Sequence, residues 1–527
     1  MKDENQQQKA EQAALRSPLL MHLRNGKHRE RISFSLPGNA NGLLYPKFLK
    51  DDYLAYDLTE LSITEDLNDP GPAIQAAEAN AAKACGASQA IFITLGSSVA
   101  IKAMIGGACG RKGTLLTALD VHKSALQAAE LLDLGLLFLN LDTIENPSKL
   151  PNLLKEHPGI SAVYLTTPDF YGHCYDISKI AAALADTNVL LIVDSAHGAH
   201  FPFGKHLLPK FAIEQGADLV VCSAHKTLPA PTPTSLILIG RRMMEKRPDL
   251  DSRKIRNLAA TFTSTSPPLM LGVGLDYAVS YMDMYGVEET AKLLEHVNEF
   301  IAKLPEGLHR VDLGISSDSK VLASNPASST DHPTHDPLRM VIDCANLCPG
   351  PRLAHDLMAN KINPEMADLC RVVLIPHFGQ PKAEFDRTLE VINKLVEEYR
   401  KIKWPSDLQT ANLRRLDAYY RKRLQVPAFS NKPYHPAACL NLDWRQDTIW
   451  VNIDEAKDKF VAEALIPYPP GIPLLWPGDK LNQDDIELFK SLIHHEINVH
   501  GTRLIGDEIK VPILKSATEN FSSTLEY

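Results

Sequence analysis

The sequence predicts an α/β protein whose main domain is built on a largely parallel sheet. Two apolar runs support this prediction, residues 189–193 and 219–222, both short and rich in β-branched side chains. Runs that are apolar throughout are typical of parallel strands buried on both faces. Asp194 ends the first run, and Ser-Ala-His-Lys at 223–226 follows the second. Ligands of open α/β sheets bind at the carboxyl ends of strands, so an aspartate and a lysine are expected at one site.

Length, composition and charge restrict the class of protein. With 527 residues, 44% hydrophobic and 23% charged, the chain is expected to be a soluble globular protein of several domains. Its net charge of -9 argues against nucleic acid or an anionic membrane as the main partner. No apolar run approaches the roughly 20 residues of a membrane span. The opening MKDENQQQKAEQ lacks the apolar core of a signal peptide, so a cytoplasmic location is expected.

The cysteines predict free thiols and no metal centre. The eight cysteines are scattered without CxxC spacing, and no histidine cluster accompanies the nearest pair, Cys344 and Cys348. His332 and Asp336 have a spacing that is weak as a metal site. Reduced, mostly buried thiols are therefore expected.

The residues at the two strand ends fit pyridoxal phosphate. This cofactor needs a lysine for its Schiff base, an acid to keep its pyridinium nitrogen protonated, and donors for its phosphate. Lys226 is the predicted Schiff-base lysine, Asp194 the pyridinium partner, and Ser223 with His225 the phosphate ligands. Either charged residue alone would be read as a turn or surface residue. Their placement after two buried strands, one helical crossover apart, favours the cofactor.

The surrounding motifs resemble the ornithine/lysine/arginine decarboxylase family. The segments AHGAHF (196–201) and SAHKTLPA (223–230) carry this resemblance, and IPYPPGIPLLWPGDKL (466–481) is similar to another family signature. The resemblance implies the PLP-dependent aminotransferase-like fold, called fold type I, and implies that His197 lies against the cofactor. It extends from about residue 17 to 515.

The resemblance and the helix and strand pattern predict four parts of the chain. They are an N-terminal segment (1–50), a PLP-binding major domain (51–305), a small α+β domain (306–404) and a C-terminal domain (405–527).

A strand, a glycine turn and a helix start predict an anion site in the first part of the major domain. A helix is expected over 73–85, a strand over 90–94, and a second helix from Ser97. Free backbone N–H groups at the helix start would face a phosphate. The segment resembles the family's phosphate-binding pattern at Gly96, Ser97 and Ser98. The alternative is that Ser97 is simply an N-cap.

Two further turns resemble the cofactor-flanking loops of the family. The strand at 115–118 leads to His122, Lys123 and Ser124, and the resemblance implies that His122 stacks on the pyridine ring. Lys123 is the rival Schiff-base lysine. The strand at 161–165 is followed by TTPDFYG, where Thr167 is a predicted cofactor contact.

The segment TFTSTSP (261–267) predicts a shared active site. It resembles a family loop whose hydroxyls reach the phosphate of the other subunit, which implies a homodimer or larger homo-oligomer. Ser264 and Thr265 are the predicted contacts. An ordinary hydroxyl-rich loop is the alternative.

The second half of the chain is predicted to form helices, strands and loops with few catalytic or binding residues. A linking helix is expected over 287–304, a surface loop over 316–337, and an α+β unit from strands at 340–342 and 372–375 with a helix over 385–399. The basic segment NLRRLDAYYRKRL is interpreted as a solvated face or subunit contact. Prolines in 466–481 predict an extended path rather than a helix or strand.

The N-terminal segment departs from the family pattern. ISFSLPGNANG (32–42) stands where the family usually resembles FHxPGHKxG, and Ser35, Asn39 and Ala40 replace His, His and Lys. Ser195 also stands where the family often has an acid. These departures leave the reaction type open.

The predicted function is PLP-dependent α-decarboxylation of a basic amino acid to a polyamine-type amine, with arginine ahead of lysine and ornithine. Lys226, Asp194, His122 and His197 form the predicted catalytic set. The acid for the substrate's distal cation is expected among Asp479, Glu463 and Glu365. An aminotransferase, cyclase or elimination enzyme remains an alternative, as does a non-catalytic regulatory homologue.

Overall fold

The computed structural model describes the protein from residue 31 to residue 515, with gaps. The described residues are 31–39, 42–51, 53–58, 60, 64–312, 314, 333–405, 408–425, 433–468 and 470–515. Three features of the sequence lie outside these residues: Ala40, His332 and a short helix expected around 19–23.

The main domain is built on a mainly parallel sheet, as the apolar runs predict. Among the described residues, seven strands form it in the order β2-β8-β7-β6-β5-β3-β4. The strands are β2 (Gln89–Ile93), β3 (Thr114–Thr117), β4 (Gly135–Phe138), β5 (Ile160–Thr166), β6 (Leu190–Asp194), β7 (Leu219–Cys222) and β8 (Ser235–Ile239). Strand β8 runs antiparallel to both of its neighbours, and the other pairings are parallel.

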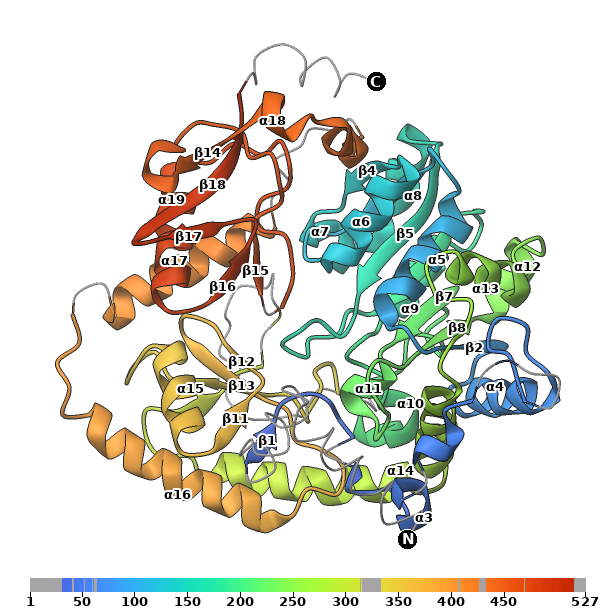
Figure 1. Cartoon of the computed structure of the whole chain (residues 1–527), viewed down its shortest axis with the longest axis horizontal. Coiled ribbons are helices and arrows are strands. Elements are labelled where there is room, and N and C mark those ends of the chain that lie inside the picture. Colours follow the sequence, from blue (N-terminus) through green and yellow to red (C-terminus); the bar gives the residue numbers. More distant parts are fainter. Residues whose placement is uncertain are drawn as a thin grey trace, which may run out of the picture.

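Helices bury both faces of this sheet (Figure 1). One face is covered by α5 (Ser97–Cys109), α6 (Lys123–Leu132), α12 (Arg241–Lys246) and α13 (Ser252–Ala260). The other face is covered by α4 (Pro72–Ala84), α7 (Leu141–Glu145), α8 (Leu150–Glu156), α9 (Ile177–Ala183), α10 (Phe201–Gly204) and α14 (Leu269–Ala302). Neighbouring side chains of β6 point to opposite faces, so Leu190 and Leu191 belong to different core clusters. This double burial explains why the strand is apolar throughout.

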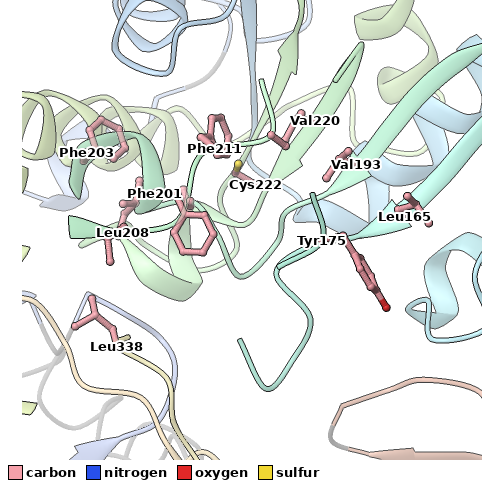
Figure 2. Close-up of a cluster of buried hydrophobic side chains, with 14 of the residues drawn as sticks. Leu165, Tyr175, Val193, Phe201, Phe203, Leu208, Phe211, Val220, Cys222 and Leu338 are labelled. Carbon is pink, nitrogen blue, oxygen red and sulfur yellow. The ribbon is translucent and has the colours of Figure 1, made fainter. Parts of the chain in front are cut away.

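The hydrophobic core cluster on the face covered by α10 and α14 extends from the strands to the small domain. Figure 2 shows Val193 of β6 and Cys222 of β7 on the same side as the ring of Phe211, and Leu338 belongs to the same cluster. Leu338 precedes the first long strand of the small domain. The ends of β6 and β7 are therefore held on the same core as the entry to that domain.

Helix α14 is longer than predicted and links the main and small domains. It begins at Leu269, well before the expected residue 287, and runs through 34 residues. Glycines in its first half interrupt the apolar periodicity of the sequence. A Cβ at Gly274 would lie 2.6 Å from Pro231 Cγ, and one at Gly286 would lie 2.7 Å from Phe203 Cβ. Close packing against neighbouring segments thus explains why these positions are glycine, and the glycines made the start of the helix hard to recognise in the sequence.

The small domain packs two helices against an antiparallel sheet. Its elements are β9 (His309–Arg310), β10 (Met340–Asp343), α15 (Gly350–Ala359), β12 (Met366–Ala367), β13 (Arg371–Leu374) and α16 (Lys382–Tyr399). The N-terminal strand β1 (Ile32–Phe34) pairs in parallel with β11 (Ile362–Pro364) of this domain. The expected surface loop over 316–337 is wrong at its described end, because the side chain of Asp336 is 1% exposed.

The C-terminal domain contains a three-stranded sheet, a two-stranded ribbon and two long helices. Its elements are α17 (Thr410–Arg423), η7 (Pro436–Asn441), α18 (Trp444–Asp447), β14 (Thr448–Asn452), η8 (Ile453–Glu455), β15 (Ile466–Tyr468), α19 (Gln483–His494), β16 (Asn498–His500), β17 (Arg503–Ile505) and β18 (Glu508–Leu514). The proline-rich segment is therefore not wholly irregular, because β15 pairs with β16. Pro467 is tolerated because a two-stranded ribbon leaves one edge of each strand without a ladder partner.

Shorter elements complete the described chain. They are α3 (Lys47–Asp51), η3 (Tyr53–Tyr56), η4 (Pro147–Lys149), η5 (Lys205–Leu207) and α11 (Ala224–Thr227). Across the described ranges, no helix combines the length and the apolar character that crossing a membrane would need.

Buried ion pairs join the C-terminal domain to the small domain. Arg371 of β13 donates to both carboxylate oxygens of Asp417 on α17, at 2.8 and 2.7 Å. Arg414 of the same helix pairs with Asp343 at the end of β10. Arg421 is 4% exposed and pairs with Asp417. The interpretation of α17 as a solvated basic face is therefore wrong for these arginines, which neutralise buried carboxylates.

Substitution of Arg371 tests how strongly this junction depends on paired charges. We expect Arg371→Ala to lower the free energy of unfolding by about 3 to 5 kcal/mol, because Asp417 would keep its burial and lose its bidentate partner. The matched control is Arg387→Ala, which removes the exposed pair with Glu390 on α16 and should cost less than about 1 kcal/mol. Urea unfolding followed by circular dichroism measures both, and equal effects would contradict the prediction.

Candidate active site

The predicted aspartate and lysine lie at adjacent strand ends. Asp194 is the last residue of β6, and Lys226 lies on α11, which follows β7. Strands β6 and β7 are paired, so the carboxyl ends of both meet at one edge of the sheet. Beside them, Thr167 N donates to Asp194 O at 2.9 Å and its Oγ1 accepts from Tyr175 N, which ties the turn after β5 to the same place.

The carboxylate of Asp194 is held by two donors and makes no ion pair within 4.0 Å among the described residues. Tyr164 Oη donates to Oδ2 at 2.9 Å, and the amide of Ala196 donates to Oδ1 at 3.0 Å. Burial raises the pKa of Asp194, while the charge of Lys226 and these hydrogen bonds oppose that rise. A protonated ring nitrogen would supply the missing positive charge, which is the role expected of this residue in holding pyridoxal phosphate.

The environment of Lys226 disfavours the charged form of its amine. Burial lowers the pKa of Lys226, and the nearby carboxylates of Asp194 and Glu365 only partly offset this. A neutral amine is the form that attacks a carbonyl carbon. This fits the aldehyde of pyridoxal phosphate, which a lysine must capture.

His197 bridges the lysine and a buried arginine. Its Nε2 lies 3.0 Å from Lys226 Nζ, and its Nδ1 lies 3.3 Å from Arg339 Nη2. Because a guanidinium can only donate, Nδ1 is the acceptor and Nε2 carries the proton. Burial and the neighbouring cations keep the pKa of His197 well below its ordinary value. The Nε2–H of the neutral histidine therefore faces the amine of Lys226.

Serine hydroxyls form a cradle at the start of α5. Gly96 adopts φ +85° before the helix, and Ser97 and Ser98 are its first residues. Ser223 Oγ donates to Ser97 Oγ at 2.8 Å, and Ser124 Oγ donates to Ser98 Oγ at 2.9 Å. Hydroxyls and free N–H groups at a helix N-terminus fit the phosphate of the cofactor.

His225 and His122 flank this cradle. His225 Nδ1 lies 2.7 Å from the carbonyl oxygen of Thr234 and donates to it, so Nε2 is left as the other polar atom. His122 is the N-cap of α6, and its Nδ1 accepts from Ser124 N at 3.2 Å. Burial lowers the pKa of His122 to about 3, and Lys226 acts in the same direction. Both rings are available as neutral contacts, as expected for a stacking histidine and a phosphate ligand.

Ser264 and Thr265 are not brought to this site within one chain. Both are exposed on the turn between α13 and α14. The carbonyl oxygen of Ser264 accepts from Asn68, and its Oγ accepts from Ser266 N. Lys123, the rival lysine, lies 3.5 Å from His500 Nδ1. The roles of all these residues stay predictions.

The N-terminal segment that departs from the family pattern also borders the site. Gly38 N donates to His225 O at 2.9 Å, and Leu36 N donates to Glu365 Oε2 at 2.9 Å. Ser35 and Asn39 therefore stand in a segment that contacts both the lysine loop and the half-buried Glu365. Their replacement of histidines bears directly on the chemistry available there.

Sequence reasoning missed three residues of the site. Arg339 is 0% exposed, and its Nε and Nη1 make no hydrogen bond with the described residues. Tyr164 lies inside a strand and was read as core. Asp336 was assigned to a surface loop, yet it lies 3.2 Å from His200 Nε2. A signal for the last pair was present in the second histidine of AHGAHF and in Asp-Pro-Leu-Arg at 336–339.

Comparison with protein families matches most of the chain. The model of the Orn/Lys/Arg decarboxylase major domain matches residues 17–376, and that of the corresponding C-terminal domain matches residues 419–500. The chain belongs to the Orn/Lys/Arg decarboxylase family. The resemblance read from the sequence motifs is therefore confirmed.

Relatives of this family member cover nearly its whole length. It is similar to an uncharacterised protein of Bacillus subtilis (strain 168), YaaO, at 28% identity over 93% of this chain and 96% of the relative. It is 24% identical to the arginine decarboxylase of the same organism, over 90% of this chain and 94% of that enzyme. The lysine decarboxylase LdcF of Francisella novicida superposes with a TM-score of 0.68 at 18% identity, covering 90% of this chain and 76% of that one.

These comparisons establish the class of fold and of enzyme. The fold is the aminotransferase-like fold type I predicted from the resemblance. The protein is a PLP-dependent amino acid decarboxylase by family membership, and the family implies pyridoxal phosphate as the cofactor.

Chemical trapping distinguishes Lys226 from Lys123 as the cofactor lysine. We expect borohydride reduction of the cofactor-loaded protein to fix a pyridoxyl group on Lys226, because its amine is the one held near Asp194 with a lowered pKa. Peptide mapping by mass spectrometry locates the label. Lys226→Ala should abolish labelling, whereas Lys123→Ala should keep it. A label on Lys123 in the native protein would overturn the assignment.

Proposed function

We propose that this family member decarboxylates a basic amino acid, with arginine as the preferred substrate. The observation that carries the proposal is that a buried guanidinium with unmade hydrogen bonds and a half-buried carboxylate both lie near Lys226. Arg339 lies beside Lys226 in a small cavity and has two nitrogens without hydrogen-bond partners among the described residues. Glu365 lies close enough to both to influence their pKa values. An amino acid with a cationic side chain carries charges complementary to both.

Arg339 is the proposed anchor for the α-carboxylate. A buried guanidinium with unmade hydrogen bonds is costly, and an anionic ligand removes that cost. The Nη2 contact with His197 and the charge of Asp336, 3.9 Å away, hold the guanidinium in place. Fixing the carboxylate fixes the direction of the bond that must break.

Glu365 is the proposed acid for the distal cation. Of the three predicted acids, Asp479 accepts from Trp476 N and lies 3.5 Å from Arg423, so it stabilises its own turn. Glu463 is exposed, and the charge near it is that of Arg503. Glu365 is half-buried, and desolvation raises its pKa, with Lys226 and Arg339 opposing. A guanidinium from the substrate would favour the ionised carboxylate.

The residues of this chain divide the remaining tasks. Bound pyridoxal phosphate supplies the electron sink for the electron pair left at Cα when carbon dioxide departs. Asp194 stabilises the positive ring nitrogen. Lys226 Nζ, which lies 3.0 Å from His197 Nε2, would return a proton to Cα from its protonated form. Ser35 and Asn39, which replace family histidines, motivate transamination or elimination as the second candidate reaction.

Measurement of carbon dioxide release tests the substrate and the reaction. We expect the purified enzyme with pyridoxal phosphate to release carbon dioxide from arginine with a higher kcat/KM than from lysine or ornithine. A bidentate carboxylate and guanidinium pair is the physical reason for that order. Consumption of arginine without carbon dioxide would contradict decarboxylation and leave the cofactor assignment standing.

Glu365→Gln provides the matched variant for this measurement. It should raise KM for arginine at least tenfold and leave the cofactor absorption band unchanged, because it removes the charge facing the distal cation. Glu463→Gln is the control, and an equal effect of the two would contradict the assignment of Glu365.

Mixed subunits test whether the active site is shared. Within the described part of the chain, Ser264 on this exposed turn is hydrogen-bonded by Asn68 and Ser266, so we expect the turn to reach the phosphate of a partner subunit. Ser264→Ala and Lys226→Ala proteins should each be impaired, and should regain part of the activity when unfolded and reassembled together. A fully active monomer in analytical ultracentrifugation would contradict a shared site.

A further inference from the structure

The C-terminal domain contacts the loop that carries His122. The contacting residues are Pro467, Tyr468 and Gly471, here called the Gly471 corner. Gly471 N donates to Pro467 O at 3.1 Å, which closes the corner on itself. Lys123 N donates to Gly471 O at 3.0 Å, which joins the corner to the residue after His122. This hydrogen bond links a signature of the C-terminal domain to the cofactor side of the main domain.

The contact leaves little room for a side chain at Gly471. A Cβ there would lie 3.1 Å from both Cδ2 and Cε2 of Tyr468, and 3.3 Å from His122 Cδ2. Gly471 also has φ +88°, in the left-handed region that favours glycine. The edge of the His122 ring therefore packs directly against the backbone of the corner.

The other edge of the His122 ring is fixed by its own helix. Nδ1 accepts from Ser124 N and lies 2.7 Å from Ser124 Oγ. The ring is thus held between the start of α6 on one side and Gly471 on the other. With its pKa lowered to about 3, it stays neutral and has no charge to anchor it.

The corner itself is braced by aromatic and cationic side chains. The rings of Tyr468 and His500 stack with centroids 4.8 Å apart and an interplanar angle of 17°. Lys123 Nζ lies 5.1 Å from the centre of the Tyr468 ring, within the range of a cation–π contact. The β15–β16 ribbon brings these two rings together. The corner is therefore a rigid support.

We propose that the Gly471 corner positions His122, so that the C-terminal domain sets the orientation of the residue stacked on the cofactor. Gly471 is a positioning residue in this proposal, since it acts through His122. The proposal rests on the stacking role of His122 under the proposed function. It assigns a task to the YPPG part of the C-terminal signature, which no step of the decarboxylation uses.

Substitution of Gly471 tests the proposal against a matched glycine. Gly506 of the same domain also has positive φ, +61°, but a Cβ there would meet nothing within 4 Å. Gly471→Ala and Gly506→Ala therefore introduce the same kind of backbone strain, and only the first crowds His122. We expect Gly471→Ala to lower kcat at least tenfold and to change the circular dichroism of the bound cofactor. Gly506→Ala should change neither by more than twofold.

A double-mutant cycle separates positioning from a general structural effect. If Gly471 acts through His122, its substitution in a His122→Ala background should lower kcat by less than twofold further, because the ring it positions is gone. A tenfold loss in both backgrounds would overturn the proposal. The spectrum of the bound cofactor allows the same double-mutant comparison without turnover. The test is therefore valid whichever amino acid is the substrate. Failure to decarboxylate arginine would thus count against the proposed function alone.

A second pair of variants breaks the linking hydrogen bond and displaces the corner, because a proline Cδ would take the place of the N–H that Lys123 points at Gly471 O. Lys123 is the first residue of α6, where proline is well tolerated, and His122 has φ -62° and ψ 144°, which a following proline permits. Lys123→Pro deletes the N–H that donates to Gly471 O, and Lys123→Ala keeps it. We expect Lys123→Pro to have a kcat at least threefold below that of Lys123→Ala, with a shifted cofactor spectrum. Equal kcat values and spectra would overturn the proposal.

Discussion

The burial of opposite charges at the carboxyl ends of β6 and β7 is the constraint on which the site depends. Asp194 and Lys226 are each driven by burial toward the neutral form, and each restrains the other. Charges of this kind persist in a protein interior only when partners and hydrogen bonds compensate them. The parallel sheet provides the compensation, because paired strands end at the same edge and bring Tyr164 and the Ala196 amide to the carboxylate.

The small domain and the C-terminal domain add groups near Lys226 and His122 that the sheet does not supply. The small domain contributes Arg339 and Glu365, one cation and one acid whose charges act on Lys226. The C-terminal domain contributes the backbone of Gly471 against His122. The buried pairing of Arg371 with Asp417 holds these two domains together. The ion pairs at this junction thus affect the site, because they fix the relative positions of the small domain and the C-terminal domain.

The departures from the family pattern fall where they affect chemistry most. Ser35 and Asn39 belong to the segment whose backbone contacts the lysine loop and Glu365. Histidine at either place would add a titratable group near the reacting bond. His197, in contact with Lys226 at 3.0 Å, is a histidine that this chain keeps beside the lysine.

The sequence by itself determined the strands, the cofactor-side motifs and the family. These features are local: an apolar run reports double burial, and Asp194 and Lys226 follow such runs directly. Only the tertiary structure decided which distant residues join them. Arg339 follows a loop that reads as surface, and Gly471 belongs to a proline-rich segment with no chemical side chain. Their roles depend on burial and on contacts between residues hundreds of positions apart, and no local pattern records such contacts.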